Sequence, residues 1–268
     1  MPYTTERECS IEVEEKVKVS VNGSIAIITI NNPTKRNALD FDMLKLFRAI
    51  FEKLEADPGM RVVIIRGEGD KAFCAGFSID RIDTDGKAQN FLEETFGCIR
   101  ASRLPVIAMQ NGIVVGAGLD LSLNCDIRVA ADDVKFGITP AKIGVVYHRE
   151  GIKRLAESVG VAVAKELLYT GGLINSKRAL QIGLVNLVVD RGELESTVGG
   201  IAGDIAGNAP LSVSGTKKIL NSLLDFSPFT EEESGNFATL SLEAFRSMDH
   251  AEGQKAFLEK RRPVFQGI

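Results

Sequence analysis

The chain has 268 residues, of which 44% are hydrophobic and 25% charged, a composition typical of a globular protein with one substantial core. A net charge of −4 disfavours a nucleic-acid-binding surface, because neutralising phosphates requires clustered Lys and Arg. No stretch reaches the roughly 18 unbroken apolar residues of a membrane span, and the four cysteines and two histidines lack metal-ligand spacing. We therefore expect a cytoplasmic protein without a metal, a membrane or a nucleic-acid partner.

The first elements are predicted from local patterns. Residues 1–15 carry charges where a secretory signal needs an apolar centre, and we interpret them as a ragged N-terminus. The alternating segments KVKVSV and SIAIITI flank Asn22-Gly23, the strongest short hairpin signal. Asp40 can then cap a helix whose apolar residues recur at three-to-four spacing as far as Leu54, before an Asp-Pro-Gly sequence ends it.

Strands and helices alternate in the next part of the chain. Buried strands are predicted at RVVIIRG (61–67), PVIAMQ (105–110) and DIRVAA (126–131), with helices around 91–100 and from about 116. This order is typical of a mainly parallel, stacked α/β fold. From about residue 212 strand signals vanish, and we expect helices as far as residue 265. We therefore divide the chain into a core (16–205) and a C-terminal helical subdomain (206–268) that contacts other subunits.

Two runs of small residues follow buried strands: KAFCAGFSID (71–80) and NGIVVGAGLDL (111–121). Each is predicted to be a loop from which a helix departs, where unpaired backbone N–H groups attract negative charge. Two such groups converging on one oxygen would form an oxyanion hole, and the amides of Phe77 and Ala117 are the candidate donors. Glycines at such turns are also common for steric reasons alone. A dinucleotide fingerprint at Gly116-Ala117-Gly118 is disfavoured, because Leu121 stands where a third glycine is expected.

These motifs resemble those of the crotonase (enoyl-CoA hydratase/isomerase) superfamily. The resemblance runs through ITINNPTKRNAL, FCAGFSID, PVIAMQNGIVVGAGLDLSLNCDIRVA, KFGITPAKIGVVY and ELLYTGGLINSKRALQIGLVNLVV. It implies a superhelix of ββα turns with a C-terminal helical region, coenzyme A thioester substrates, no permanently bound cofactor, and trimers or pairs of trimers. The family's two oxyanion donors fall on Phe77 and Ala117, the amides already selected.

The resemblance also implies where coenzyme A binds. The residues expected to line its site are Arg36, Ala38, Ala75, Phe77, Ser78, Ile79 and Lys260. Lys260, with Arg261, would contact the coenzyme A phosphates across a subunit boundary. A solvated helix end is the alternative interpretation of these two basic residues.

The acid/base positions depart from the hydratase pattern. Hydratases of the family use a Glu shortly after the second glycine run and another about twenty residues later, and these positions are Asp120 and Pro140 here. Proline cannot move a proton, and hydration needs groups for both the water and the carbon proton, so ordinary two-Glu hydration is disfavoured. Asp120 could act as a lone base, or it could be a helix residue stabilised by the helix dipole.

The segment GVVYHREG (144–151) places Tyr147 and His148 on the loop that the family brings over the acyl group. ITPAKIGVVY and the ending AEGQKAFLEKRRPVFQG resemble the methylmalonyl-CoA decarboxylase branch, where a tyrosine at the position of Tyr147 helps to hold the substrate carboxylate. The residue after the first glycine is a histidine in that branch and Phe77 here. Phe77 resembles the chlorobenzoyl-CoA dehalogenase branch, but the nucleophilic Asp of that branch falls on His148.

The favoured function is therefore decarboxylation of a malonyl-type acyl-CoA through an enolate held in the oxyanion hole. Phe77, Ala117, Asp120, Tyr147 and His148 are the candidate catalytic residues. Enoyl-CoA isomerisation or hydration with Asp120 as the base remains an alternative. A coenzyme A-binding protein without turnover is another, suggested by Pro140 and Ala117. An RNA-binding role is disfavoured by the acidic charge balance.

Overall fold

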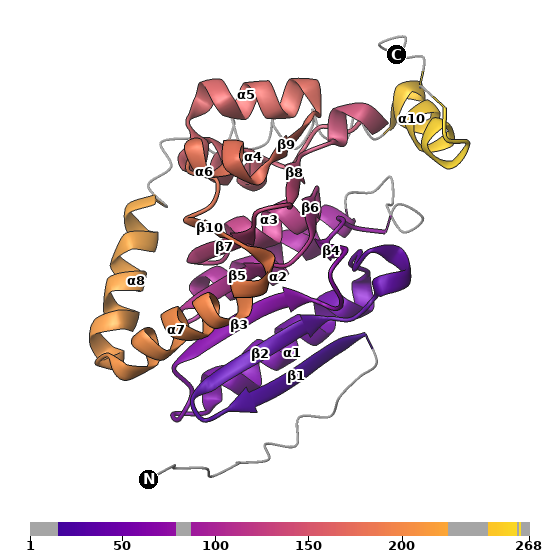
Figure 1. Cartoon of the computed structure of the whole chain (residues 1–268). Helices are drawn as coiled ribbons and strands as arrows, with labels where there is room; N and C mark the ends of the chain where they lie inside the picture. The colour runs from indigo at the N-terminus through magenta and orange to yellow at the C-terminus, as the bar shows by residue number, and fades with distance from the viewer. Residues whose placement is uncertain (1–15, 79–86, 225–245, 262, 264–268) are drawn as a thin grey trace.

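The computed structural model describes residues 16–78, 87–224, 246–261 and 263 (Figure 1). A six-stranded sheet has the order β1-β2-β3-β5-β7-β10, in which only β1 and β2 pair antiparallel. Its strands are β1 (Val17–Asn22), β2 (Ile25–Ile30), β3 (Val62–Gly67), β5 (Val106–Gln110), β7 (Ile127–Ala131) and β10 (Leu187–Val189). The predicted hairpin is confirmed, and Gly23 turns it with a positive φ of 60°.

A second sheet of four short strands has the order β4-β6-β8-β9. These strands are β4 (Ala72–Cys74), β6 (Ile113–Val115), β8 (Lys135–Gly137) and β9 (Leu173–Asn175). Three of them come directly after a strand of the first sheet, so that β3-β4, β5-β6 and β7-β8 are successive pairs, each leading to a helix. The expected ββα repeat is therefore confirmed, although β6 and β8 were not predicted.

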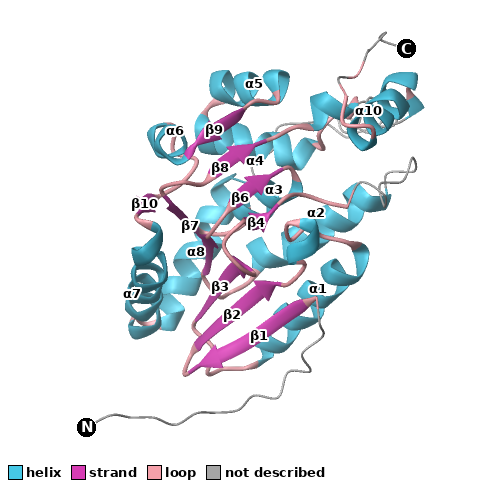
Figure 2. Ribbon diagram, turned by 45° about the vertical axis from the view of Figure 1, so that its right-hand side comes forward, coloured by secondary structure: helices cyan, strands magenta, loops and turns pink. Residues whose placement is uncertain are grey.

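The helices pack around the sheets. They are α1 (Phe41–Ala56), α2 (Lys87–Ala101), α3 (Ala117–Leu123), α4 (Arg149–Val159), α5 (Val161–Thr170), α6 (Ser176–Gln181), α7 (Leu194–Gly207), α8 (Pro210–Leu224) and α10 (Met248–Leu258), with 3₁₀ turns η1 (Pro33–Lys35), η3 (Pro140–Ile143) and η4 (Arg191–Glu193). Helix α7 contacts β2, β3, β5 and β7, while α1 and α2 pack against each other on the opposite side of the molecule (Figure 2).

Helix α1 forms where the sequence predicts it. The carboxylate of Asp40 accepts a hydrogen bond from the backbone N–H of Met43 at 2.9 Å, which satisfies an N–H group that has no partner inside the helix. Six apolar side chains on one face are buried: Met43, Leu44, Phe47, Ile50, Phe51 and Leu54. This stripe joins the core under the first sheet, and the helix ends at Asp57 as expected.

The described C-terminal segments are helical, as the sequence predicts, and α8 begins two residues before the predicted position. Helix α10 lies against η3 because two glycines permit it: a Cβ on Gly253 would lie 2.5 Å from the Ile143 backbone, and one on Gly144 would lie 2.7 Å from the carbonyl carbon of Asp249. His250 Nδ1 also lies 3.1 Å from the carbonyl oxygen of Ile143. The C-terminal part of the chain thereby touches a loop that borders the cavity described next.

Candidate active site

A cavity of about 140 Å³ lies where the ends of β4 and β6 meet the η3 and α4 segments. Its lining is Ala75, Gly76, Phe77, Gln89, Leu92, Val115, Gly116, Ala117, Asp120, Thr139, Pro140, Ile143, Val145, Tyr147 and His148. All five residues that the sequence selected as catalytic candidates are in this set. The fold thus brings together positions that are far apart in the chain.

Bare backbone forms one wall of the cavity. Strands β4 and β6 are parallel neighbours, and the loop after each contains a glycine with positive φ, 110° at Gly76 and 57° at Gly116. A Cβ on Gly76 would lie 3.3 Å from the carbonyl oxygen of Val115 and 3.8 Å from the amide nitrogen of Ala117. The two loops therefore approach each other as closely as main chain allows, next to the amides of Phe77 and Ala117.

The Phe77 amide is directed by an isolated bridge to Leu39. Leu39 donates its N–H to the Gly76 carbonyl and accepts from the N–H of Ser78, both at 2.8 Å. Because alternate peptide groups of an extended chain point to opposite sides, the N–H of Phe77 points away from Leu39. Among the described residues it has no hydrogen-bond acceptor.

The Ala117 amide belongs to the first residue of α3, where a helix leaves N–H groups unpaired. It too has no acceptor in the described part of the protein, and it lines the cavity as Phe77 does. Phe77 lies in the bridge to Leu39, and the end of the first small-residue run lies outside the described residues, so the prediction that a helix departs from it stays a prediction. The next described helix is α2, which begins at Lys87.

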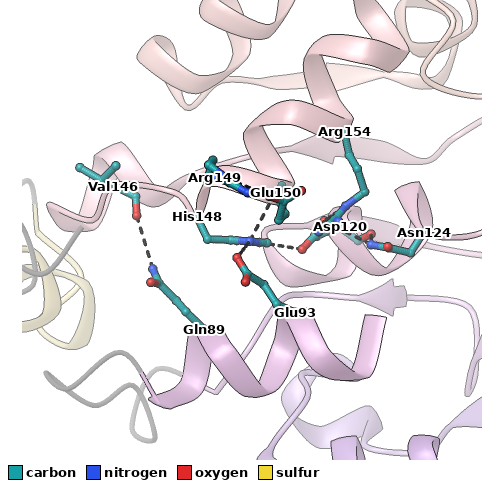
Figure 3. A network of polar contacts seen from close by, with 10 residues as sticks. Gln89, Glu93, Asp120, Asn124, Val146, His148, Arg149, Glu150 and Arg154 are labelled. Atoms are coloured by element: carbon teal, nitrogen blue, oxygen red, sulfur yellow. Dashed lines mark hydrogen bonds and ion pairs between the residues drawn. The ribbon is translucent and has the colours of Figure 1, made fainter. Parts of the chain in front are cut away.

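Asp120 lies at the buried end of the cavity within a chain of charged residues (Figure 3). His148 Nε2 lies 2.7 Å from its Oδ2 atom, and Arg154 Nε donates to its Oδ1 atom at 3.1 Å. On the other side of the imidazole ring, Nδ1 lies 2.9 Å from Glu93 Oε1. Asp120 is therefore bound by two cationic side chains, with the Glu93 carboxylate on the far side of the imidazole.

The charge states of these side chains follow from their contacts. Burial raises the pKa of Asp120, but the positive charges of His148 and Arg154 outweigh it and hold the pKa below its ordinary value. Burial likewise lowers the pKa of His148, but Asp120 and Glu93 outweigh it and raise the pKa to about 9. At neutral pH the pair is therefore a carboxylate and an imidazolium, and neither is a free base.

Tyr147 lies between this charged chain and the backbone wall. Its hydroxyl donates to the carbonyl oxygen of Gly116 at 3.3 Å, and its ring centroid is 4.7 Å from that of His148. Burial raises the pKa of the phenol well above its ordinary value, so it stays a neutral donor. The first turn of α4 has room for both rings because residue 151 is glycine, whose Cβ would lie 2.5 Å from Tyr147 Cε1.

The predicted coenzyme A contacts are only partly grouped. Ala75 and Phe77 line the cavity, Ser78 is buried beside them, and Ala75 donates its N–H to the Arg36 carbonyl at 3.1 Å. This bond brings Arg36, which is exposed, and Ala38, which is half-buried, to the same region. Lys260 is exposed after α10 and does not line the cavity, and Ile79 lies outside the described residues.

Glu93 and Arg154 were missed by the sequence analysis. They lie 55 and 34 positions from the residues that they contact, so no local motif could indicate them.

Within the described ranges no group of three or more His, Cys, Asp or Glu side chains is arranged to hold a metal ion. No described helix is long and apolar enough to cross a membrane.

Comparison with known proteins identifies the fold that carries this cavity. The sequence model of the enoyl-CoA hydratase/isomerase family matches residues 20–267. The chain belongs to this family. It is 34% identical over 247 residues to the short-chain-enoyl-CoA hydratase of Clostridium acetobutylicum, covering 90% of this chain and 93% of that protein. It is 35% identical to the crotonyl-CoA hydratase of Syntrophomonas wolfei, covering 94% of this chain and 98% of the relative.

Solved structures give the same family and the same fold. Methylmalonyl-CoA decarboxylase in complex with 2-nitronate-propionyl-CoA is similar with a TM-score of 0.89 at 31% identity, covering 94% of this chain and 99% of that one. An enoyl-CoA hydratase from Bacillus anthracis gives 0.75 at 30% identity, covering 94% and 100%. The crotonase-like α/β fold and an enzyme class acting on acyl-CoA thioesters are thereby confirmed.

Proposed function

We propose that the protein decarboxylates a malonyl-type acyl-CoA, a thioester whose α-carbon carries a carboxylate. The observation that carries the proposal is that the cavity holds no free carboxylate base. Asp120, the one acid among its described lining residues, is bound by both His148 and Arg154, and Pro140 stands at the second acid position. Hydration needs such a base, whereas decarboxylation does not.

In the proposed reaction the bond between the α-carbon and the carboxylate breaks, and its electron pair moves into the thioester carbonyl. Carbon dioxide leaves, and the carbonyl oxygen becomes the oxyanion of an enolate. The N–H groups of Phe77 and Ala117 donate to this oxygen, and each such donor contributes on the order of 3 kcal/mol to lowering the barrier. The α-carbon of the enolate then takes a proton from water as the carbonyl re-forms, which gives the product thioester and hydroxide.

Tyr147 is the proposed partner of the departing carboxylate. Its hydroxyl contacts Gly116, the residue before the oxyanion donor Ala117, so the phenol lies beside the position of the thioester carbonyl. Apolar side chains, among them Leu92 and Val145, line the rest of the cavity. A carboxylate in these surroundings loses its hydration and is destabilised, whereas neutral carbon dioxide has little hydration to lose. This difference favours the release of carbon dioxide.

The structural comparison supports the same subtype. Three structures of methylmalonyl-CoA decarboxylase give TM-scores of 0.89, 0.89 and 0.90. Five other structures of the comparison, four of them titled enoyl-CoA hydratases, give 0.74 to 0.81 at similar sequence identities. The chain is thus more similar in shape to the decarboxylase than its sequence identity alone would predict.

The test is mass spectrometry of the purified protein with methylmalonyl-, malonyl-, crotonyl- and 3-enoyl-CoA in deuterated water. Loss of carbon dioxide from a malonyl-type thioester is expected, and Tyr147→Phe should slow it about tenfold or more, as for the loss of one hydrogen bond to a charged group. Tyr169→Phe is the matched control, because Tyr169 is 73% exposed on α5. The proposal fails if Tyr147→Phe leaves carbon dioxide release untouched.

A second candidate is hydration or isomerisation of an enoyl-CoA with Asp120 as the base. The hydratase names of relatives that are 34% and 35% identical favour it. Water addition or deuterium uptake on crotonyl- or 3-enoyl-CoA in the same experiment would select it. If no thioester changed mass, the protein would bind coenzyme A without turnover.

We also propose that α8 and α10 contribute to contacts between subunits in a trimer or a pair of trimers. Large apolar side chains on both helices are more than half exposed: Leu211, Ile219, Leu220, Met248, Phe257 and Leu258. Apolar side chains exposed on a helix mark a candidate interaction surface. Light scattering should give a mass of three or six chains, and a monomer would contradict this proposal.

A further inference from the structure

Four charged side chains, from α2, α3, α4 and the residue that caps α4, form a row of contacts at the buried end of the cavity (Figure 3). Glu93 on α2 contacts His148, His148 contacts Asp120 on α3, and Arg154 on α4 contacts Asp120, with separations of 2.9, 2.7 and 3.1 Å. The Glu93 side chain is 35% exposed, whereas those of His148, Asp120 and Arg154 are 6%, 1% and 9% exposed. Of these four side chains, Glu93 is therefore the one that water chiefly reaches.

The charges next to the cavity do not cancel. Asp120 is ionised and His148 is protonated at neutral pH, so the three most buried members of the chain carry one net positive charge. Glu93 restores neutrality from the more exposed side, where water screens it. A carboxylate that enters the cavity thus meets a positive end rather than the isolated negative charge of Asp120.

The proton on His148 depends on both of its carboxylate partners. Asp120 is shared with Arg154, whose positive charge offsets part of its effect on the imidazole. Glu93 supplies the second carboxylate at Nδ1, on the opposite side of the ring. Other charged or titratable groups near this turn are Tyr147, on which Cys74 acts, and the ion pair between Arg149 and Glu150, on which Lys153 acts.

Helix α2 also holds the backbone of this loop. Gln89, one turn before Glu93, donates to the carbonyl oxygen of Val146 at 3.5 Å (Figure 3). The same face of α2 therefore fixes both the main chain and the imidazole of the segment that carries Tyr147. The Glu93 carboxylate itself is oriented by its 2.9 Å contact with His148 Nδ1.

We propose that Glu93 and Arg154 are positioning residues that select the substrate by charge. Through His148 and Asp120 they make the buried end of the cavity positive, so that it accepts an acyl group that carries a carboxylate. The inference rests on the proposed function for the class of thioester. Neither Glu93 nor Arg154 lines the cavity, so both act through the two residues that do.

The affinities of succinyl-CoA and butyryl-CoA, measured at pH 7, test the charge selection. Their acyl groups have the same number of carbons and differ by one carboxylate, and the carboxylate of succinyl-CoA is one carbon too far from the carbonyl to leave as carbon dioxide. We expect wild-type protein to bind succinyl-CoA about tenfold more tightly, which corresponds to about 1.4 kcal/mol. Arg154→Met should lose most of this preference. When the measurement is repeated over a range of pH values, Glu93→Gln should lose the preference at a lower pH than the wild type does, because its His148 gives up the proton at a lower pH.

Glu94→Gln is the matched control. It is the same substitution at the next residue of α2, where the side chain is 60% exposed and pairs with Arg48. It should keep the wild-type preference for succinyl-CoA.

The titration of His148 separates a charge effect from a structural one. The chain has two histidines, so NMR of protein with ¹³C-labelled histidine can follow His148, with His250→Gln to assign the signals. In Glu93→Gln the titration midpoint should fall to a lower pH while the circular dichroism spectrum stays unchanged. An unchanged midpoint, an unchanged preference in Arg154→Met, or equal wild-type affinity for the two thioesters would overturn the inference. Carbon dioxide release without the preference would overturn the inference alone, and the preference without carbon dioxide release would overturn the proposed function alone.

Discussion

Stability should depend on pH through His148, whose side chain is only 6% exposed. The pKa of this imidazole is raised from 6.5 to about 9, so the folded protein binds the proton more tightly than the unfolded chain does. The contribution of this proton to stability is complete below about pH 6.5 and is lost as the pH rises through 9. His148→Gln removes the titration and keeps a side chain that can donate one hydrogen bond.

The size of the effect follows from the two pKa values. The difference between about 9 and 6.5, at about 1.36 kcal/mol for each pKa unit, corresponds to roughly 3 kcal/mol of unfolding free energy. Asp120 changes its own charge only in the acid range, because its pKa is held below its ordinary value. Of the two members of this pair, only the imidazole therefore titrates between neutral and alkaline pH.

Urea unfolding of the two proteins at about pH 6 and about pH 9.5 measures this difference. At equal protein concentration, so that assembly contributes equally, the wild type should lose roughly 3 kcal/mol more than His148→Gln between the two pH values. An equal decline in both proteins would refute the reasoning, because it would show that the native state does not hold the proton on His148.

Three further substitutions test the backbone wall, the packing of the rings and the core. Gly76→Val, at a φ of 110° and with a Cβ 3.3 Å from the Val115 carbonyl, should shift the Phe77 amide and lower turnover about 100-fold in a protein with unchanged circular dichroism. Normal turnover would show that this loop is not the oxyanion hole. Gly151→Ala places a methyl group 2.5 Å from Tyr147 Cε1 and should lower kcat with little change in KM, and the reverse pattern would count against it. Lys217→Met breaks the 2.8 Å ion pair with Asp126, in which the Lys217 side chain is 6% exposed, and should lower the unfolding free energy by about 3 kcal/mol without changing KM. An unchanged Tm would contradict this last expectation.

Local patterns predicted the parts of the fold that local interactions determine. The β1–β2 hairpin follows from alternation around Asn22-Gly23, and α1 follows from its cap and apolar stripe. The short strands β6, β8 and β9 were not predicted, because three residues are too few to show an alternating pattern. They exist because neighbouring short strands hydrogen-bond to one another, which depends on tertiary contacts.

The residues of the site likewise fall into those with a local sequence signal and those without one. Phe77 and Ala117 were selected because glycines and small residues beside a strand end leave backbone N–H groups accessible, and this signal is local. The contacts of Glu93 and Arg154 with the site follow from the tertiary structure, which packs α2 and α4 against α3. Two residues that set the charge of Asp120 and His148 thus lie beyond what motif spacing can indicate.

The two proposed oxyanion donors are main-chain groups, held by loops that follow the parallel neighbours β4 and β6. A main-chain donor is kept through nearly any side-chain exchange, and only the glycines beside it are restricted by their backbone angles. The oxyanion hole can therefore be kept during evolution while the side chains that face the acyl group change. Proteins with names as different as carnitinyl-CoA dehydratase and methylmalonyl-CoA decarboxylase can then share one architecture with this chain, and their chemistry can diverge at positions such as 120, 140, 147 and 148.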